Sequence, residues 1–443
     1  MLTLFFLVTL LLVFLVGAPI AFGLGFIAVL GTILFLDPAQ LSQLVQIAYD
    51  QGTSTTQLVA PLFILMAELI SNGGIAGDIY SVLSKWLKKI PGSLGLSTIL
   101  ASTIFAALCG SSPATAVTIG KISIPEMNSR GYKPSFSVGA TVAGGTLGIM
   151  IPPSLTFIVF GIITQTSIVQ LFMAGILPGL LLSLLLCVFI LLRVLANPAL
   201  VNHPMGPSLA SQELASTSQS VAQGDSFLRD LLKILPALAL ICFIMGSMYA
   251  GWATPTEAGG IGALGALLIV LASGRLTWKG FLHILRESAK TSAMILFIII
   301  GGLCFSFVVS SLGIPQQLSE VILGISLNKW ITLFFYYILL IILGCLMDPV
   351  SMIVVTMPFV FPALTKLGFD PIFLGVVSTL LVEIGMITPP VGMNLFVIKG
   401  ITNMSFKEVV KGSMPFVGVL LIGLLIITIF PDIILYLPNL MRN

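Results

Sequence analysis

The chain has very little charge. Of its 443 residues only 8% are Asp, Glu, Lys or Arg, whereas 57% are hydrophobic. Soluble domains carry about 25% charged residues, and a surface this poor in charge is solvated by lipid and not by water. The net charge of +3 is too small to indicate a nucleic-acid partner. The composition therefore excludes a soluble globular protein and predicts an all-α polytopic membrane protein.

Histidine and cysteine are scarce as well. The two histidines, His203 and His283, lie in segments expected in the cytoplasm, and the five cysteines are scattered through apolar runs. Such cysteines are typical of small buried residues, not of a disulfide framework or a metal site. The H-E-x-x-H, G-x-S-x-G and G-x-x-x-x-G-K-[ST] motifs are missing. The sequence thus predicts no enzyme and no cofactor, so energy must come from an ion gradient or a partner.

The N-terminus lacks a basic n-region. Residues 1–16 are apolar with no preceding Lys or Arg, and a second apolar run over 18–36 follows almost at once. A signal peptide needs a basic n-region and a small-residue cleavage site. We expect two retained spans here, with a cleaved leader as the alternative.

Two parts of the sequence correspond to each other. GYKP at 131–134 resembles GFDP at 368–371, and GIMIPP at 148–153 resembles GMITPP at 385–390, both at an offset of 237 residues. Several features in one register favour an internal repeat over chance matching.

A further match has nearly the same offset, because NGGI at 72–75 resembles SLGI at 311–314. We therefore expect a first repeat over residues 1–196 and a second over 229–443. Residues 197–228, rich in Ser, Gln, Ala and Pro, are typical of a flexible cytoplasmic linker.

The basic residues give an orientation. Fourteen of the 19 Lys and Arg residues form five clusters, which the positive-inside rule assigns to the cytoplasm. Residues 93–125 leave this side and return to it, which predicts a re-entrant hairpin. When the membrane crossings are counted from the basic clusters, the equivalent hairpin at 329–362 enters from the periplasm. The first half then crosses five times, so the second half is inverted and both termini are expected in the periplasm.

Other segments flank the hairpins. The apolar stretches at 135–166 and 371–398 are interrupted by Gly, Ser and Pro, which predicts broken spans. Irregular backbone is tolerated at membrane depth only where protein encloses a cavity, so broken spans indicate a transporter's binding site. The amphipathic stretches at 76–90 and 275–290 favour arms lying in the cytoplasmic interface, with ordinary loop helices as the alternative.

The hairpin tips and the broken spans offer oxygen ligands of the kind that sodium prefers, namely freed carbonyls and hydroxyls. Packing and kinking are the alternative roles of these residues. The candidate sodium-binding residues are Gly110, Ser111, Ser112, Thr115, Gly148, Met150, Asp348, Ser351, Gly385 and Thr388.

The half-helix after the first tip would direct its positive N-terminus at a substrate anion. Lys121 adds a positive charge to this segment. A side chain that only extends to the membrane interface would explain this lysine equally well. The candidate substrate-binding residues are Ser112, Lys121, Pro152, Pro153 and Asn394.

Acids at membrane depth are costly, which makes Asp348 and Glu383 candidate ion or proton groups. Asp348 also fits a helix cap equally well. We expect Glu68, near the cytoplasmic end of its span, to be interfacial.

The ordered set of motifs resembles the large membrane subunit of TRAP transporters (tripartite ATP-independent periplasmic transporters, DctM-like). The resemblance covers nearly the entire chain. It is carried by GAPIA at 17–21, PLFILM at 61–66, GSSPATA at 110–116, IPEM at 124–127, RGY at 130–132, GTLGIMIPPS at 145–154, DP at 348–349, GFDP at 368–371 and ITPPVGMNLF at 387–396.

The resemblance implies an elevator transporter of the bacterial inner membrane that uses a sodium gradient to import organic acid anions, such as C4-dicarboxylates, keto acids or sugar acids. It also implies two partners: a small four-helix membrane subunit on a separate chain and a periplasmic substrate-binding protein. Sodium would bind at the tips and broken spans, as assigned above. Pro113 stands where the family pattern has alanine, which affects the local geometry of the first tip.

Two alternatives remain from the sequence. A stand-alone sodium- or proton-coupled carboxylate transporter fits the same symmetry. An intramembrane hydrolase using Ser111 or Ser112 would need a base that neither histidine supplies.

Overall fold

A computed structural model describes residues 5–6, 8–10, 12–13, 17–201, 227–324 and 328–442. The described residues form an all-α protein, as predicted. Most of the expected linker, including His203, lies outside the described residues. The helices of the first half are α2 (Ile20–Phe35), α3 (Leu41–Thr53), α4 (Val59–Asn72), α5 (Ile75–Trp86), α6 (Ser93–Cys109), α7 (Ser112–Ser129), α8 (Pro134–Thr146), α9 (Leu155–Thr164) and α10 (Ile168–Ala196).

The second half follows the same order and adds one helix at its end. Its helices are α12 (Phe227–Tyr249), α13 (Pro255–Ala272), α14 (Trp278–Ser311), α15 (Ile314–Gly324), α16 (Lys329–Gly344), α17 (Pro349–Lys366), α18 (Pro371–Met386), α19 (Met393–Ile401), α20 (Phe406–Ile429) and α21 (Asp432–Arg442). The expected hairpins are α6–α7 and α16–α17, and the expected broken spans are α8–α9 and α18–α19.

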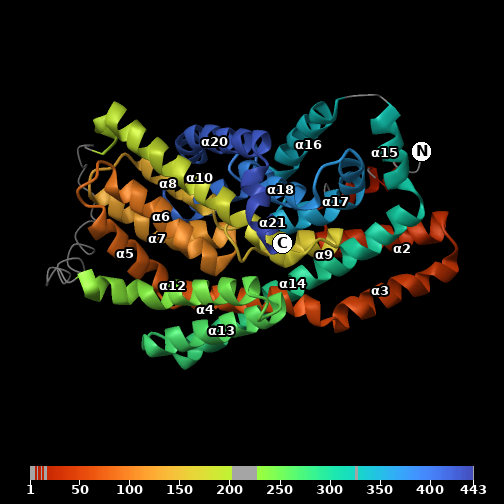
Figure 1. Cartoon of the computed structure of the whole chain (residues 1–443), viewed down its shortest axis with the longest axis horizontal. Helices are drawn as coiled ribbons and strands as arrows, with labels where there is room; N and C mark the ends of the chain where they lie inside the picture. The colour runs from red at the N-terminus through yellow and green to blue at the C-terminus, as the bar shows by residue number, and fades with distance from the viewer. Residues whose placement is uncertain are drawn as a thin grey trace.

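The two hairpins lie toward opposite ends of the molecule (Figure 1). Each packs against the broken span of the other half as well as against its own, because α7 contacts α8 and α19 while α17 contacts α9 and α18. The two predicted hairpins and the two predicted broken spans are therefore present, and each hairpin packs against the broken spans of both halves.

Seven helices in the described part of the chain are long and apolar enough to cross a membrane. Several others are shorter, including α6, α9, α16 and α18. A complete span needs about 20 residues, so none of these pieces is long enough to cross the membrane alone. They meet where Gly or Pro interrupts the helical backbone.

The segment expected as the first arm, 76–90, largely coincides with α5, which spans Ile75–Trp86; we keep the name first arm for this helix. The expected second arm at 275–290 is wrong. Residues 278–290 are the first turns of the 34-residue helix α14, because no Gly or Pro interrupts the sequence from residue 281 to 300. The second-half equivalent of α5 is α15. Both helices follow a glycine with positive φ, Gly74 at 75° and Gly313 at 68°.

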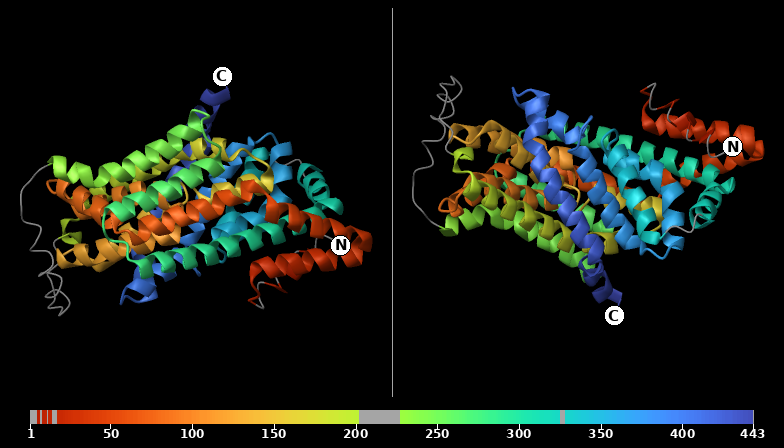
Figure 2. Two further views of the ribbon diagram at one scale, coloured as in Figure 1. Left: turned by 90° about the horizontal axis from the view of Figure 1, so that it is seen from below. Right: turned by 90° about the horizontal axis from the view of Figure 1, so that it is seen from above.

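Residues 41–53 form α3, which packs against α14. Together α3 and α4 occupy the place in the first half that α14 occupies in the second. Figure 2 shows α2 and α3 at one end of the molecule, whereas α21 projects from one face.

Candidate functional site

The first hairpin tip lies directly against the first broken span. Helices α6 and α7 meet at Gly110, which has a φ of 62°. The carbonyl oxygen of Gly110 accepts a hydrogen bond from the amide of Leu155, at 3.4 Å. A Cβ on Gly148 would lie 2.6 Å from the carbonyl oxygen of Ser111, so only glycine fits this approach.

The second tip contacts its broken span in the same way. The carbonyl oxygen of Cys345 accepts a hydrogen bond from the amide of Gly392, at 3.0 Å. A Cβ on Gly385 would lie 2.7 Å from the Cα of Gly344. The predicted facing of each tip with one break is therefore present in both halves.

A buried hydroxyl without an oxygen or nitrogen partner occupies each tip. Thr115 lies in the first turn of α7, and Ser351 lies in the first turn of α17. Both side chains are buried; the Ser351 hydroxyl has no hydrogen-bond partner, and the Thr115 hydroxyl has only the weakly polar Cys109 thiol beside it. Leaving a hydroxyl buried and unpaired costs about 1–3 kcal/mol. Each tip thus has an oxygen available for a ligand.

Other predicted residues are already engaged. The Asp348 carboxylate accepts a hydrogen bond from the Ser351 amide at 3.0 Å, so it caps α17. The Thr388 hydroxyl donates to the carbonyl oxygen of Ile384. Ser111 is the half-exposed residue before α7, whereas Met150 is fully buried in the first break.

Ser112 connects the two halves inside the protein. Its hydroxyl oxygen lies 2.9 Å from the carbonyl oxygen of Gly145 and 2.9 Å from Glu383 Oε2. It also accepts a hydrogen bond of 2.7 Å from Asn394 Nδ2. All three side chains are completely buried. The sequence identified Glu383 as an acid at membrane depth and Asn394 as a candidate for substrate, but not their contact with Ser112.

The arrangement around Ser112 does not resemble a hydrolase site, because its side-chain partners are a carboxyl and an amide. Within the described part of the chain, no three His, Cys, Asp or Glu side chains cluster as metal ligands. The contacts are those of a packed polar junction.

Lys121 is not part of this junction. It is exposed and lies nine residues along α7 from Ser112, about 13 Å at 1.5 Å per residue. Pro152 and Pro153 are buried in the first break, with the Pro153 carbonyl facing Gly110. The predicted substrate residues therefore fall into two groups.

Lys121 lines a cleft of about 510 Å³ between α4 and α7. Ligand pockets of 300–1,000 Å³ accommodate small organic molecules. Glu68, expected to be interfacial, lies half-buried in the cleft wall and accepts a hydrogen bond from Asn72. The lining residues are Glu68, Ser71, Asn72, Pro113, Ala114, Val117, Thr118, Lys121 and Ile122.

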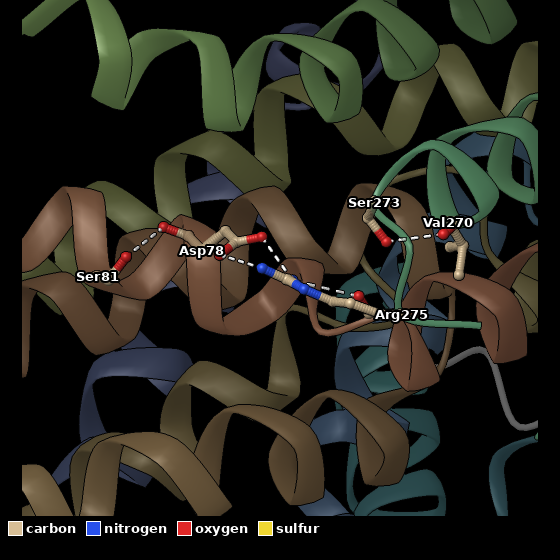
Figure 3. A network of polar contacts seen from close by, with 6 residues as sticks. Asp78, Ser81, Val270, Ser273 and Arg275 are labelled. Carbon is tan, nitrogen blue, oxygen red and sulfur yellow. Dashed lines mark hydrogen bonds and ion pairs between the residues drawn. The ribbon is translucent and has the colours of Figure 1, made fainter. Parts of the chain in front are cut away.

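Two ion pairs attach α5 to the second half of the chain. Arg275 in the α13–α14 turn pairs with Asp78 (Figure 3). Lys85 pairs with Asp230 of α12, with a nitrogen–oxygen distance of 3.1 Å. The first arm is therefore fixed near both of its ends.

The fold is shared with a solved transporter. The chain is similar to the Alcanivorax borkumensis YdaH transporter, whose structure is described as having an unusual topology. The TM-score is 0.64 over 91% of each chain, at 14% sequence identity. This likeness supports the architecture alone.

The sequence comparisons are more specific. Residues 7–433 match the family described as the tripartite ATP-independent periplasmic transporter, DctM component. The C4-dicarboxylate TRAP transporter large permease protein DctM of Pseudomonas aeruginosa is 35% identical, over 92% of each chain. The isethionate TRAP transporter permease protein DctMQ of Oleidesulfovibrio alaskensis is 32% identical over 94% of this chain, which covers 63% of that longer protein. The resemblance drawn from the motifs is thus confirmed: this chain belongs to the DctM family and is the large permease of a TRAP transporter, a multi-pass membrane transport protein and not an enzyme.

Proposed function

We propose that this permease is a sodium-driven importer of organic acid anions in the bacterial inner membrane. Sodium would bind at the two tip-and-break pairs. The observation that carries this proposal is the pair of buried hydroxyls of Thr115 and Ser351 near the starts of equivalent helices, neither of which has an oxygen or nitrogen partner. Freed backbone carbonyls in the adjacent breaks supply further oxygen ligands.

The substrate is an anion in this proposal. The N-terminus of α7 carries the positive end of its helix dipole at the first tip. Lys121 adds a full charge to the cleft that runs along the same helix. C4-dicarboxylate and isethionate, named for two relatives, are both anions. The class extends to keto acids and sugar acids.

Transport would proceed by an elevator motion. The cleft lies between α4, which packs with α13 and α14, and α7, which packs with α8 and α19; one side-chain hydrogen bond, between Ser71 and Thr118 at 2.9 Å, crosses it and would have to break. Movement along this boundary would carry the tips and breaks together past a fixed frame. The α6–α7 hairpin would face the cytoplasm, and both termini would face the periplasm.

Two partners complete the proposal. A small four-helix membrane subunit would brace the frame, and a periplasmic binding protein would deliver the substrate. The DctMQ relative is longer than this chain, which is consistent with a second subunit fused to it.

The test is the thermal stability of the purified permease in sodium against choline at fixed ionic strength. A ligand that binds only the folded state stabilises it by mass action. We expect a saturable, sodium-specific rise in melting temperature. The same curve in both salts, for the permease alone and with its small subunit, contradicts sodium coupling.

A stand-alone carboxylate transporter is the second candidate, favoured by the complete pairing of tips and breaks within this one chain. Proteoliposomes containing the permease alone, with free substrate, separate the two functions. Full sodium-driven uptake without a binding protein would establish the second candidate.

A further inference from the structure

One serine hydroxyl contacts both sides of the second break. Glu383 lies near the end of α18, before the break, and Asn394 lies in the first turn of α19, after it. Both reach Ser112 at the start of α7, across more than 270 residues of sequence. A shift of α18 relative to α19 must therefore break at least one of these two hydrogen bonds.

The polar groups of this junction depend on one another. Asn394 Oδ1 has no hydrogen-bond partner, and the Glu383 carboxyl accepts hydrogen bonds from the Ser112 hydroxyl and from the backbone amide of Ile149 in the first break. Ser112 therefore supplies the side-chain hydrogen bond that holds each of them. The ion pairs among the described residues do not include Glu383. Truncating either partner would leave the others buried and poorly paired.

Glutamine is the conservative replacement for Glu383, because the Ser112 hydroxyl has only one hydrogen to donate. A serine hydroxyl has one hydrogen, yet both Gly145 O and Glu383 Oε2 lie within hydrogen-bonding distance. An amide nitrogen at position 383 would donate to Ser112 and leave the serine hydrogen for Gly145. Alanine at that position would leave Ser112 with Asn394 alone in the second half.

We propose that Glu383 and Asn394 are positioning residues that hold Ser112 and the first tip in the conformation that binds the coupling cation. The cation site of the first half would then form only when the second break has its present geometry. This inference rests on the proposed sodium coupling, and it adds that the two pseudo-symmetric sites are linked through one hydroxyl.

The experiment is a sodium titration of the thermal stability of four proteins: wild type, Glu383→Gln, Glu383→Ala and Thr103→Val. The last is the control, because it removes another intramembrane side-chain pair, Thr103 with Ser183, away from the tips. We expect Glu383→Ala to raise the half-saturating sodium concentration about tenfold, as losing a buried hydrogen bond implies. Glu383→Gln should restore it to within about threefold. Thr103→Val should melt lower without sodium but keep the wild-type half-saturation.

The outcomes separate the inference from the proposed function. An unchanged half-saturation in Glu383→Ala, with a lower melting temperature, makes the junction purely structural and overturns the inference. A wild type without sodium response overturns the sodium coupling itself. Should Glu383→Ala not fold, Asn394→Ala makes the same comparison from the other side of the break, and its unchanged half-saturation overturns the inference equally.

Discussion

Arg275 and Asp78 form a two-bond ion pair between opposite halves of the chain. Arg275 Nη1 lies 2.7 Å from Asp78 Oδ2, and Nη2 lies 3.1 Å from Oδ1. Nη1 also lies 3.3 Å from the carbonyl oxygen of Gly73. One guanidinium therefore contacts both sides of the turn between α4 and α5, and its hydrogen bonds to Asp78 raise the pKa of Arg275.

We expect Arg275→Lys to lower the melting temperature, because an ammonium cannot reproduce the planar fork of contacts. The coupling energy between Arg275 and Asp78, from a double-mutant cycle with Asp78→Asn, should stay below about 1 kcal/mol. The pair is only half-buried, with side-chain exposures of 46% and 27%. Lys290→Gln, which removes an exposed pair within α14, is the control and should change little.

Gly148→Ala should abolish transport and lower the melting temperature. The new Cβ would lie 2.6 Å from the carbonyl oxygen of Ser111, so tip and break must separate. Gly246→Ala in α12 is the matched control, since a Cβ there contacts nothing. It should be neutral or stabilise the helix by about 0.5–1 kcal/mol. Normal uptake by Gly148→Ala would show that the close approach is dispensable.

Ser112→Ala and Thr388→Ala should each weaken the activation of uptake by sodium. Each removes one hydroxyl, Ser112 at the first tip and Thr388 in the second break. The measurement is uptake into proteoliposomes as a function of external sodium. Ser183→Ala, a hydroxyl outside both breaks, serves as the control. Unchanged sodium curves in both variants would move the ion sites away from these hydroxyls.

The charge of Asp348 can be separated from its capping role. Asparagine is as good a helix N-cap as aspartate, whereas alanine costs about 1 kcal/mol. Because the carboxylate caps α17 through the Ser351 amide, we expect Asp348→Asn to keep both stability and sodium response. Asp348→Ala should melt lower. A loss of sodium response in the stable Asp348→Asn variant would instead identify Asp348 as an ion ligand.

Lys121→Ala should raise the apparent KM for the transported anion by about three- to tenfold, about 0.7–1.4 kcal/mol of lost attraction. The ammonium lines the cleft next to α4. Lys121→Arg should retain most of the affinity, and Lys89→Ala outside the cleft should leave it unchanged. An unaltered KM for Lys121→Ala would support a lysine that only snorkels to the interface.

The breaks were predictable because their cause is local. Single Pro residues lie inside several helices, such as Pro125 in α7 and Pro178 in α10, but clusters of Gly, Ser and Pro interrupt the helical backbone, so GSSP at 110–113 and TPP at 388–390 predicted a tip and a break. The shared offset of 237 residues then matched each motif of the first half with its counterpart in the second.

The charge pattern and the internal repeat indicate different places for the second arm. Trp278, Lys279 and Lys290 give an amphipathic composition typical of an interfacial helix. The match between residues 72–75 and 311–314 places the counterpart of α5 at α15, which begins at Ile314.

The junction at Ser112 could not be predicted from sequence. It depends on how the first hairpin packs into the opposite half, and the two partners lie 271 and 282 residues away. Only the burial of an acid at position 383 hinted that some polar partner was required.

The helices that precede the two hairpins differ in the ion pairs that hold them. Helix α5 is tied to the second half near both ends, by Asp78 with Arg275 and by Lys85 with Asp230. Among the described residues, no ion pair involves its counterpart α15. The helix before the first hairpin is thus tied to the opposite half by two ion pairs that, in the described part of the chain, the helix before the second hairpin lacks. We therefore expect two hairpins that belong to one internal repeat to differ in the amplitude of their thermal motion.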